Sequence, residues 1–95
     1  MHFSFSGPLI EWRGPAPFVF VRFGESLSAE LKLAAAGLEY WGQVAVAVTI
    51  AGVEFTTALF PRDGVYLLPL KAAVRSRLAV EVGDWVEGEL SLTRR

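Results

Sequence analysis

The residues best suited to bind a charged ligand form one basic stretch in the second half of the chain. Lys71, Arg75 and Arg77 are close together in the sequence, and Arg62 precedes them. Lys71 and Arg75 are one helical turn apart, so in a helix they share a face without an acidic partner and could bind an anion or an acidic partner. We favour the alternative that these cations form ordinary surface ion pairs with the carboxylates that follow. These carboxylates are Glu81, Asp84, Glu87 and Glu89.

A second candidate surface is aromatic. Trp41, Tyr66 and Trp85 are candidates for a patch that contacts a partner or ligand, and Trp12 and Tyr40 could extend it. Large exposed rings are typical of interaction surfaces. We favour the alternative that these rings pack in the core or cover the ends of the fold. The adjacent rings of Tyr40 and Trp41 are expected to point to opposite sides.

Catalytic and metal-binding patterns are weak. His2 is the only histidine, and no partner for it is visible in the sequence. Asp84 follows Gly83, and we interpret it as a turn residue that accepts hydrogen bonds from the next backbone amides. The chain has no cysteine, and no glycine-rich segment joins a strand to a helix as phosphate loops require. We therefore predict no catalytic residue, no metal site and no cofactor.

Composition indicates one globular domain over residues 1–95. The chain is 53% hydrophobic, and nine basic against ten acidic residues give a net charge of −1. A nucleic-acid partner is not expected, since outside the basic stretch no local cluster could displace counterions from phosphates. No apolar run is long enough to cross a bilayer, and the N-terminus lacks the basic start of a signal peptide. We expect a cytoplasmic protein, and the scarcity of Asn, Gln, Cys and Met is compatible with a thermophilic source.

Apolar periodicity predicts about six strands and two helices. The strands are expected at residues 3–12, 18–23, 43–50, 53–60, 65–70 and 85–92, and the helices at 26–36, with Ser26 as N-cap, and 71–79. In the first strand Phe3 and Phe5 share a face. Beyond Gly7-Pro8 we expect a bulge that lets Ile10 and Trp12 face inward as well. Residues 61–64 are predicted to form a turn.

The element order repeats: strand, strand, helix, strand, twice. The halves are about residues 1–51 and 52–95, which suggests an ancient duplication closed into a pseudo-symmetric barrel with a helix at each end. The pattern of the last strand also favours a small closed barrel. It puts Trp85 on the face with Glu87 and Glu89, and Gly88 on the apolar face. A glycine on the inner face of a small barrel permits close approach of the backbone at a sharp bend.

Several stretches together resemble the uncharacterised prokaryotic domain-of-unknown-function family nineteen hundred and five. They are "PFVFV" at 17–21, "GQVAVAVTIAGVEFTTALFP" at 42–61, the Pro-x-x-Gly-Val-Tyr turn at 61–66, "LKAAVRSRL" at 70–78 and "VGDWVEGELSL" at 82–92. The resemblance implies a double-split β-barrel related to the swapped-hairpin fold of AbrB and MazE regulators and antitoxins. It says little about mechanism. Trp41, just before Gly42, departs from the smaller residue expected there.

The expected fold is therefore mainly β, a small double-split barrel of about six strands capped by two short helices. The expected role is a binding or interaction module without catalytic apparatus, with a homodimer or another protein as its partner. One alternative is a DNA-binding or antitoxin-like transcriptional regulator, by fold analogy alone. The other is a small-molecule enzyme or its accessory domain, which would need a deep pocket with convergent polar groups.

Overall fold

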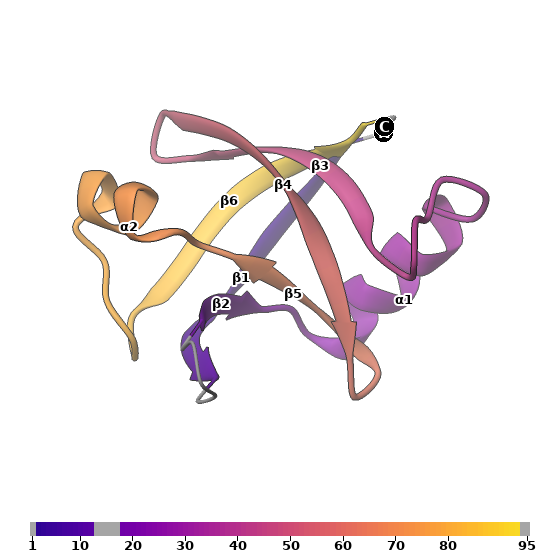
Figure 1. Cartoon of the computed structure of the whole chain (residues 1–95), viewed down its shortest axis with the longest axis horizontal. Helices are drawn as coiled ribbons and strands as arrows, with labels where there is room; N and C mark the ends of the chain where they lie inside the picture. The colour runs from indigo at the N-terminus through magenta and orange to yellow at the C-terminus, as the bar shows by residue number, and fades with distance from the viewer. Residues whose placement is uncertain (1, 13–17, 94–95) are drawn as a thin grey trace.

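The computed structural model describes residues 2–12 and 18–93 and has the expected architecture. Six antiparallel strands close into a barrel in the order β1-β2-β5-β4-β3-β6 (Figure 1). The elements are β1 His2–Trp12, β2 Phe18–Arg22, α1 Glu25–Ala34, β3 Val44–Ile50, β4 Val53–Arg62, β5 Val65–Pro69, α2 Ala72–Leu78 and β6 Trp85–Leu92. Among the described residues, no helix is long and apolar enough to cross a membrane.

Two long strands, β1 and β4, each belong to two sheets. β1 pairs with β6 over residues 2–8 and with β2 over residues 9–12. β4 pairs with β3 over residues 53–59 and with β5 over residues 60–62. We call the half of the barrel that contains β6 and β3 sheet A, and the half that contains β2 and β5 sheet B. Exchanging the two halves of the chain leaves this strand order unchanged, so the barrel has a twofold topology.

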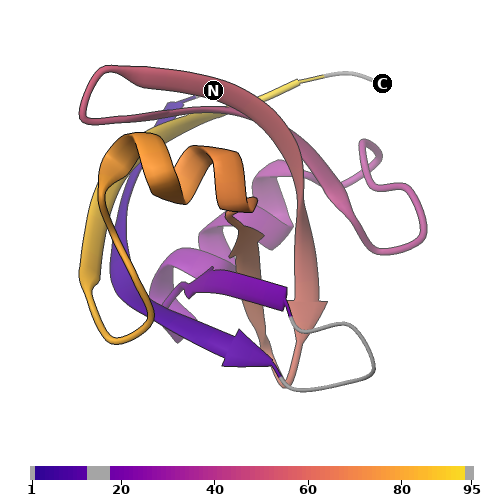
Figure 2. The same cartoon turned by 60° about the vertical axis from the view of Figure 1, so that its left-hand side comes forward.

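The inner faces of all six strands form one apolar core. Leu9, Val21, Val46, Leu68 and Leu90, one from each of five strands, are almost completely buried in it. The helices lie on opposite sides of the strands in both views (Figures 1 and 2). α1 contributes the buried residues Ser28 and Leu31, whereas α2 contributes no fully buried residue. Side chains therefore fill the space that the strands enclose.

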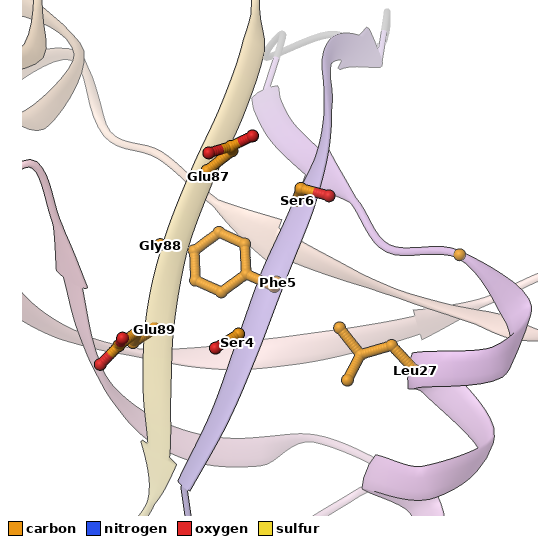
Figure 3. A pocket seen from close by; sticks show the side chains of 8 residues that line it. Ser4, Phe5, Ser6, Leu27, Glu87, Gly88 and Glu89 are labelled. Carbon is orange, nitrogen blue, oxygen red and sulfur yellow. The ribbon is translucent and has the colours of Figure 1, made fainter.

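Glycine is required where the barrel backbone approaches most closely. A Cβ at Gly88 would lie 2.6 Å from the carbonyl oxygen of Thr49 and 2.8 Å from the ring of Phe5. Figure 3 shows the Phe5 ring beside Gly88, where a side chain would have to stand. A Cβ at Gly7 would lie 2.1 Å from the carbonyl oxygen of Arg22. The absence of a side chain on the apolar face of β6 is thus explained by the tight inner packing of β1, β3 and β6.

The prediction of a bulge in β1 is wrong. The register runs without interruption from Gly7 opposite Val86 to Pro8 opposite Trp85, and then to the pairs with β2. The strand changes partner after Pro8 but keeps its alternation, so the inward residue there is Leu9. Ile10 and Trp12 consequently face outward, contrary to our expectation.

Several boundaries also differ from the predicted ones by one or two residues. Helix α1 begins one residue earlier than predicted, with Gly24 rather than Ser26 as its N-cap and no side-chain cap. Strand β4 continues through Arg62, so the predicted turn at 61–64 is a two-residue turn at Asp63-Gly64. Both turn residues have positive φ, 52° and 82°, as a type I′ hairpin requires. Ala51-Gly52 forms a turn of the same kind between β3 and β4, with φ of 48° and 81°.

Candidate binding surface

The outer faces of the two sheets differ sharply in chemistry. Strand alternation points Glu54, Glu87 and Glu89 outward from sheet A, beside serines, threonines and alanines. An open hollow of about 580 Å³ on this side is lined by Ser4, Ser6 and the carboxylates of Glu87 and Glu89 (Figure 3). Apart from His2, no basic side chain points outward from the described strands of sheet A. This side of the barrel is polar and acidic.

Sheet B has the opposite character. The outward positions of its four strands, all within the described part of the chain, carry apolar residues and two arginines, and no acid. We call this surface the aromatic–arginine face. It comprises Ile10, Trp12, Phe18, Phe20, Arg22, Phe60, Arg62, Val65, Leu67 and Pro69. Phe20, Val65 and Leu67 of this face form a small buried cluster separate from the inner core.

The phenylalanines of this face form a row. Phe20 contacts Phe18 on one side and Phe60 on the other, with ring centroids 6.2 and 6.5 Å apart. Phe20 is buried, whereas Phe18 is 59% and Phe60 42% exposed. Monomeric proteins rarely leave contiguous large apolar surface exposed without a use for it. The row is therefore a candidate contact surface.

The two arginines of this face differ in their contacts. The Arg62 guanidinium lies over the Trp12 ring, 3.4 Å from the ring centroid, which is close enough for a cation–π interaction. Its nearest carboxylate, Asp63, is 3.8 Å away and highly exposed, so that ion pair is weak. Arg22 is exposed, and its side chain forms no hydrogen bond or ion pair with another described residue. A hollow of about 320 Å³ lies between the two, lined also by Trp12, Leu67 and the acidic residues Glu11 and Asp63.

A second hollow lies on the other side of the β4–β5 hairpin. It measures about 550 Å³ and lies between α1 and the hairpin, lined by Ser28, Lys32, Glu39, Arg62 and Tyr66 among others. The Ser28 hydroxyl accepts a hydrogen bond of 3.0 Å from the Tyr66 backbone N–H, which joins α1 to β5. Burial raises the pKa of the Tyr66 phenol, and the nearby charge of Glu39 raises it further. The phenol therefore remains a protonated hydrogen-bond donor in this hollow.

The predicted basic cluster does not form as one unit. Arg62 stands at the end of β4, which both views place well away from α2 (Figures 1 and 2). Arg75 donates a hydrogen bond of 3.0 Å from Nε to the carbonyl oxygen of Leu70, which ties α2 to the end of β5. The ion pairs that we favoured for Lys71, Arg75 and Arg77 are not formed with any described residue.

The carboxylates have other partners. Asp84 acts within a turn, as predicted, but its Oδ2 accepts from the preceding Glu81 N–H at 2.9 Å rather than from the next amides. Glu89 Oε1 lies 2.7 Å from His2 Nε2, and Ser91 Oγ lies 3.1 Å from His2 Nδ1. His2 therefore has partners across the β1–β6 pair that its sequence position did not suggest. All three side chains are on the open outer face of the barrel, without a buried site around them.

The predicted aromatic surface is also divided. Tyr66 is only 4% exposed, so it cannot belong to an exposed patch. Trp41 is 85% exposed at the tip of a tight turn with φ of 55°. Its ring meets that of Tyr40 edge to face at 6.1 Å, which contradicts the expectation that the two point apart. Trp85 is exposed on sheet A, as its alternation with Glu87 predicted.

Sequence reasoning missed Phe18, Phe60 and Arg22 as candidate site residues. The usable signal was the strand at 18–23, which is apolar on both faces and yet contains an arginine. One of these faces had to point away from the core. The strand order was needed to show that the outward residues of β1, β4 and β5 continue the same surface.

These features define a small double-split β-barrel with an acidic outer face and an aromatic–arginine outer face. The chain belongs to the family described as Domain of unknown function (DUF1905), whose model matches residues 5–90. It is the family that the sequence motifs resemble. No curated protein matches the chain.

Proposed function

We propose that the protein is a small binding module, and that the aromatic–arginine face is its contact surface. The observation that supports this proposal is the combination of exposed rings with arginines on one sheet face. Phe18 and Phe60 are exposed although apolar, and Arg22 has no described partner. Aromatic residues and arginine are the types most enriched where proteins bind partners.

Charge indicates that the partner is anionic. Arg22 and Arg62 point outward from sheet B, and no carboxylate shares the outward positions of its described strands. Glu11 and Asp63 line the hollow between the two arginines, so the positive charge lies on the open part of the face and not in that hollow. The opposite outer face carries three glutamates and would repel an anion. The proposed module thus presents one attractive and one repulsive side to an anionic partner.

The test is binding of a panel of anionic probes to the wild-type protein and to variants of the face. The panel contains a dT oligonucleotide, a mixed-sequence DNA duplex, thymidine monophosphate and an acidic peptide that contains tyrosine. At least one probe is expected to bind, and Phe18→Ala with Arg22→Ala should weaken its binding while the melting curve stays nearly unchanged. Trp85→Ala is the matched control, because it removes an exposed ring from sheet A. Binding that is lost equally in the control, or no binding by any probe, contradicts the proposal.

The second candidate function is a regulator that binds duplex DNA, as the AbrB-like proteins do. It is favoured by one observation: Lys71 and Arg77 lack an acidic partner among the described residues. In the same panel this function predicts salt-dependent binding of the duplex. Lys71→Ala and Arg77→Ala should weaken this binding, and Phe18→Ala should leave it unchanged.

We also propose a cytoplasmic location, which the cysteine-free composition supports.

A further inference from the structure

We propose that the aromatic–arginine face binds single-stranded nucleic acid by stacking unpaired bases on its exposed rings. This inference rests on the proposed function and names the class of partner. The net charge of −1 argues against such a partner only if charge is spread evenly over the surface. It is not spread evenly, because the outward charges of sheet B are both positive and those of sheet A are mostly negative.

The first support is the row of rings. Phe18 and Phe60 offer exposed rings, and buried Phe20 lies between them in contact with both. Fixed rings lose little conformational freedom when a base stacks on them, and Phe20 holds both neighbours. Every nucleobase has a π-face, so a row of rings binds unpaired bases with little dependence on sequence. Several sheet-based modules bind RNA or DNA strands in this way.

The second support is the placement of the guanidinium groups. The Arg62 guanidinium lies over Trp12, with its central carbon 3.4 Å from the ring centroid. A guanidinium placed over a ring can still donate from its N–H groups to phosphate oxygens. Arg22, across β5 from Arg62, has no described partner and is available for a second phosphate.

Other partners fit the face less well. A peptide that adds as a strand would pair with a backbone edge, such as the side of β1 residues 2–8 that faces away from β6. Such a peptide would not use the exposed rings and guanidinium groups of an outer sheet face. The bases of a DNA duplex are already stacked and paired, so their faces are not accessible to rings. A duplex would have to bind through phosphates alone, and two arginines supply little counterion release. Unpaired bases use both the rings and the cations.

The experiment follows the fluorescence of Trp12 during titration with a dT oligonucleotide of about eight residues, within the usual site size of a small β-barrel. The background variant carries Trp41→Phe and Trp85→Phe, which removes the other two tryptophans. Both are exposed, Trp41 at a turn tip and Trp85 on sheet A. The other arms are the mixed-sequence duplex, thymidine monophosphate and the acidic peptide. Circular dichroism and a thermal melt of each variant show that it is folded.

The expected result is saturable binding of the oligonucleotide that Phe18→Ala and Phe60→Ala each weaken about tenfold, the lower part of the range for loss of one stacked base. The logarithm of the association constant should fall against the logarithm of salt concentration with a slope of about −1.4, for two phosphates on a single strand. Arg22→Ala should reduce this slope by about half, since about 0.7 is the contribution of one phosphate. Arg77→Ala, an exposed arginine on α2, is the matched control and should change neither quantity.

Three outcomes would overturn the inference. The first is oligonucleotide binding that is unaffected by Phe18→Ala and Phe60→Ala in folded proteins. The second is a duplex or thymidine monophosphate that binds as tightly as the oligonucleotide. The third is binding of the acidic peptide but not of the oligonucleotide, with loss in the Phe18→Ala variant. In the third case the nucleic-acid inference fails while the binding module stands, whereas both fail if no probe depends on this face.

Discussion

At the scale of single residues, the inner glycines set how closely the strands can pack. Gly88→Ala should lower the free energy of unfolding by about 1–3 kcal/mol, the usual effect of overpacking a filled core. The reason is that the new Cβ would stand 2.8 Å from both the Phe5 ring and Ile50 Cγ1, and nearer still to a backbone oxygen. Urea unfolding measures the change.

Gly24→Ser is the matched control for this substitution. Nothing lies within 4 Å of a Cβ at Gly24, and serine is a good residue for the N-cap position that Gly24 occupies. Its stability should stay the same or rise by about a few tenths of a kcal/mol. Equal losses of stability at both positions would mean that the backbone conformation of glycine, and not the contacts of a new Cβ, decides the effect at Gly88.

A second residue-scale prediction concerns alkaline pH. Burial first, and the charge of Glu39 second, raise the pKa of Tyr66 above its ordinary value of 10.0. A group whose folded pKa is raised contributes stability that is fully present below the unfolded pKa and is lost as the pH rises through the folded pKa. Stability should therefore fall above about pH 10, and Tyr66→Phe should make this fall less steep.

Chemical denaturation at a series of alkaline pH values measures this slope. Phenolate absorbance in a Tyr40→Phe background, where Tyr66 is the sole tyrosine, gives the titration directly. Glu39→Gln in that background should lower the pKa of Tyr66. If Tyr66→Phe and the parent lose stability in parallel as the pH rises, Tyr66 is not the group responsible.

At the scale of elements, α2 is attached by the partly buried side chains of Val74 and Leu78 and by one side-chain hydrogen bond. The helix has no fully buried residue, and Arg75 ties it to the Leu70 carbonyl. Arg75→Ala should therefore lower stability by about 1 kcal/mol, below the range for a fully buried hydrogen bond to a charged group because Arg75 is only half-buried. Thermal unfolding measures this, and Arg77→Ala, which removes an exposed arginine from the same helix, should have little effect.

The turn of the β3–β4 hairpin has an alanine at a position with positive φ, and a substitution there should stabilise it. Ala51 has φ of 48° in a type I′ turn, where asparagine is strongly preferred over residues with an ordinary Cβ. Ala51→Asn should raise stability by about 0.5–1 kcal/mol, and Ala51→Val should lower it, because branched side chains tolerate positive φ poorly. A shift of the urea midpoint measures both. A loss with asparagine would show that the turn relaxes to another type.

The elements were largely predictable from sequence, because alternation, turn residues and helical spacing are local signals. The strand at 44–50 and the glycine turns illustrate this. The direction of Ile10 and Trp12 was not predictable, because Pro8 marks a change of strand partner and not a change of face. Likewise, the strand at 18–22 is apolar on both sides, so the strand itself cannot show which side meets the core.

At the scale of the whole molecule, the candidate surface depends on strand order. Trp12 and Arg62 are fifty positions apart, yet they touch because the ends of the two long strands, β1 and β4, meet. The basic stretch on α2 was visible in sequence because its members are neighbours. The aromatic–arginine face was not, since its residues come from four strands that only the closed barrel places side by side.

The same topology predicts that neither half of the chain folds alone. The pairs β2–β5 and β3–β6 each join the two halves, and the inner core takes residues from both. A fragment of about fifty residues buries too little apolar surface to fold without help. The fragments 1–51 and 52–95, separated within the Ala51-Gly52 turn, should therefore each be unfolded by circular dichroism, and mixing them should restore the barrel signal. The cut leaves every strand intact, which makes recovery the expected outcome. A fragment that unfolds cooperatively as a monomer would show that its half has a core of its own, and would contradict a single interior shared by both halves.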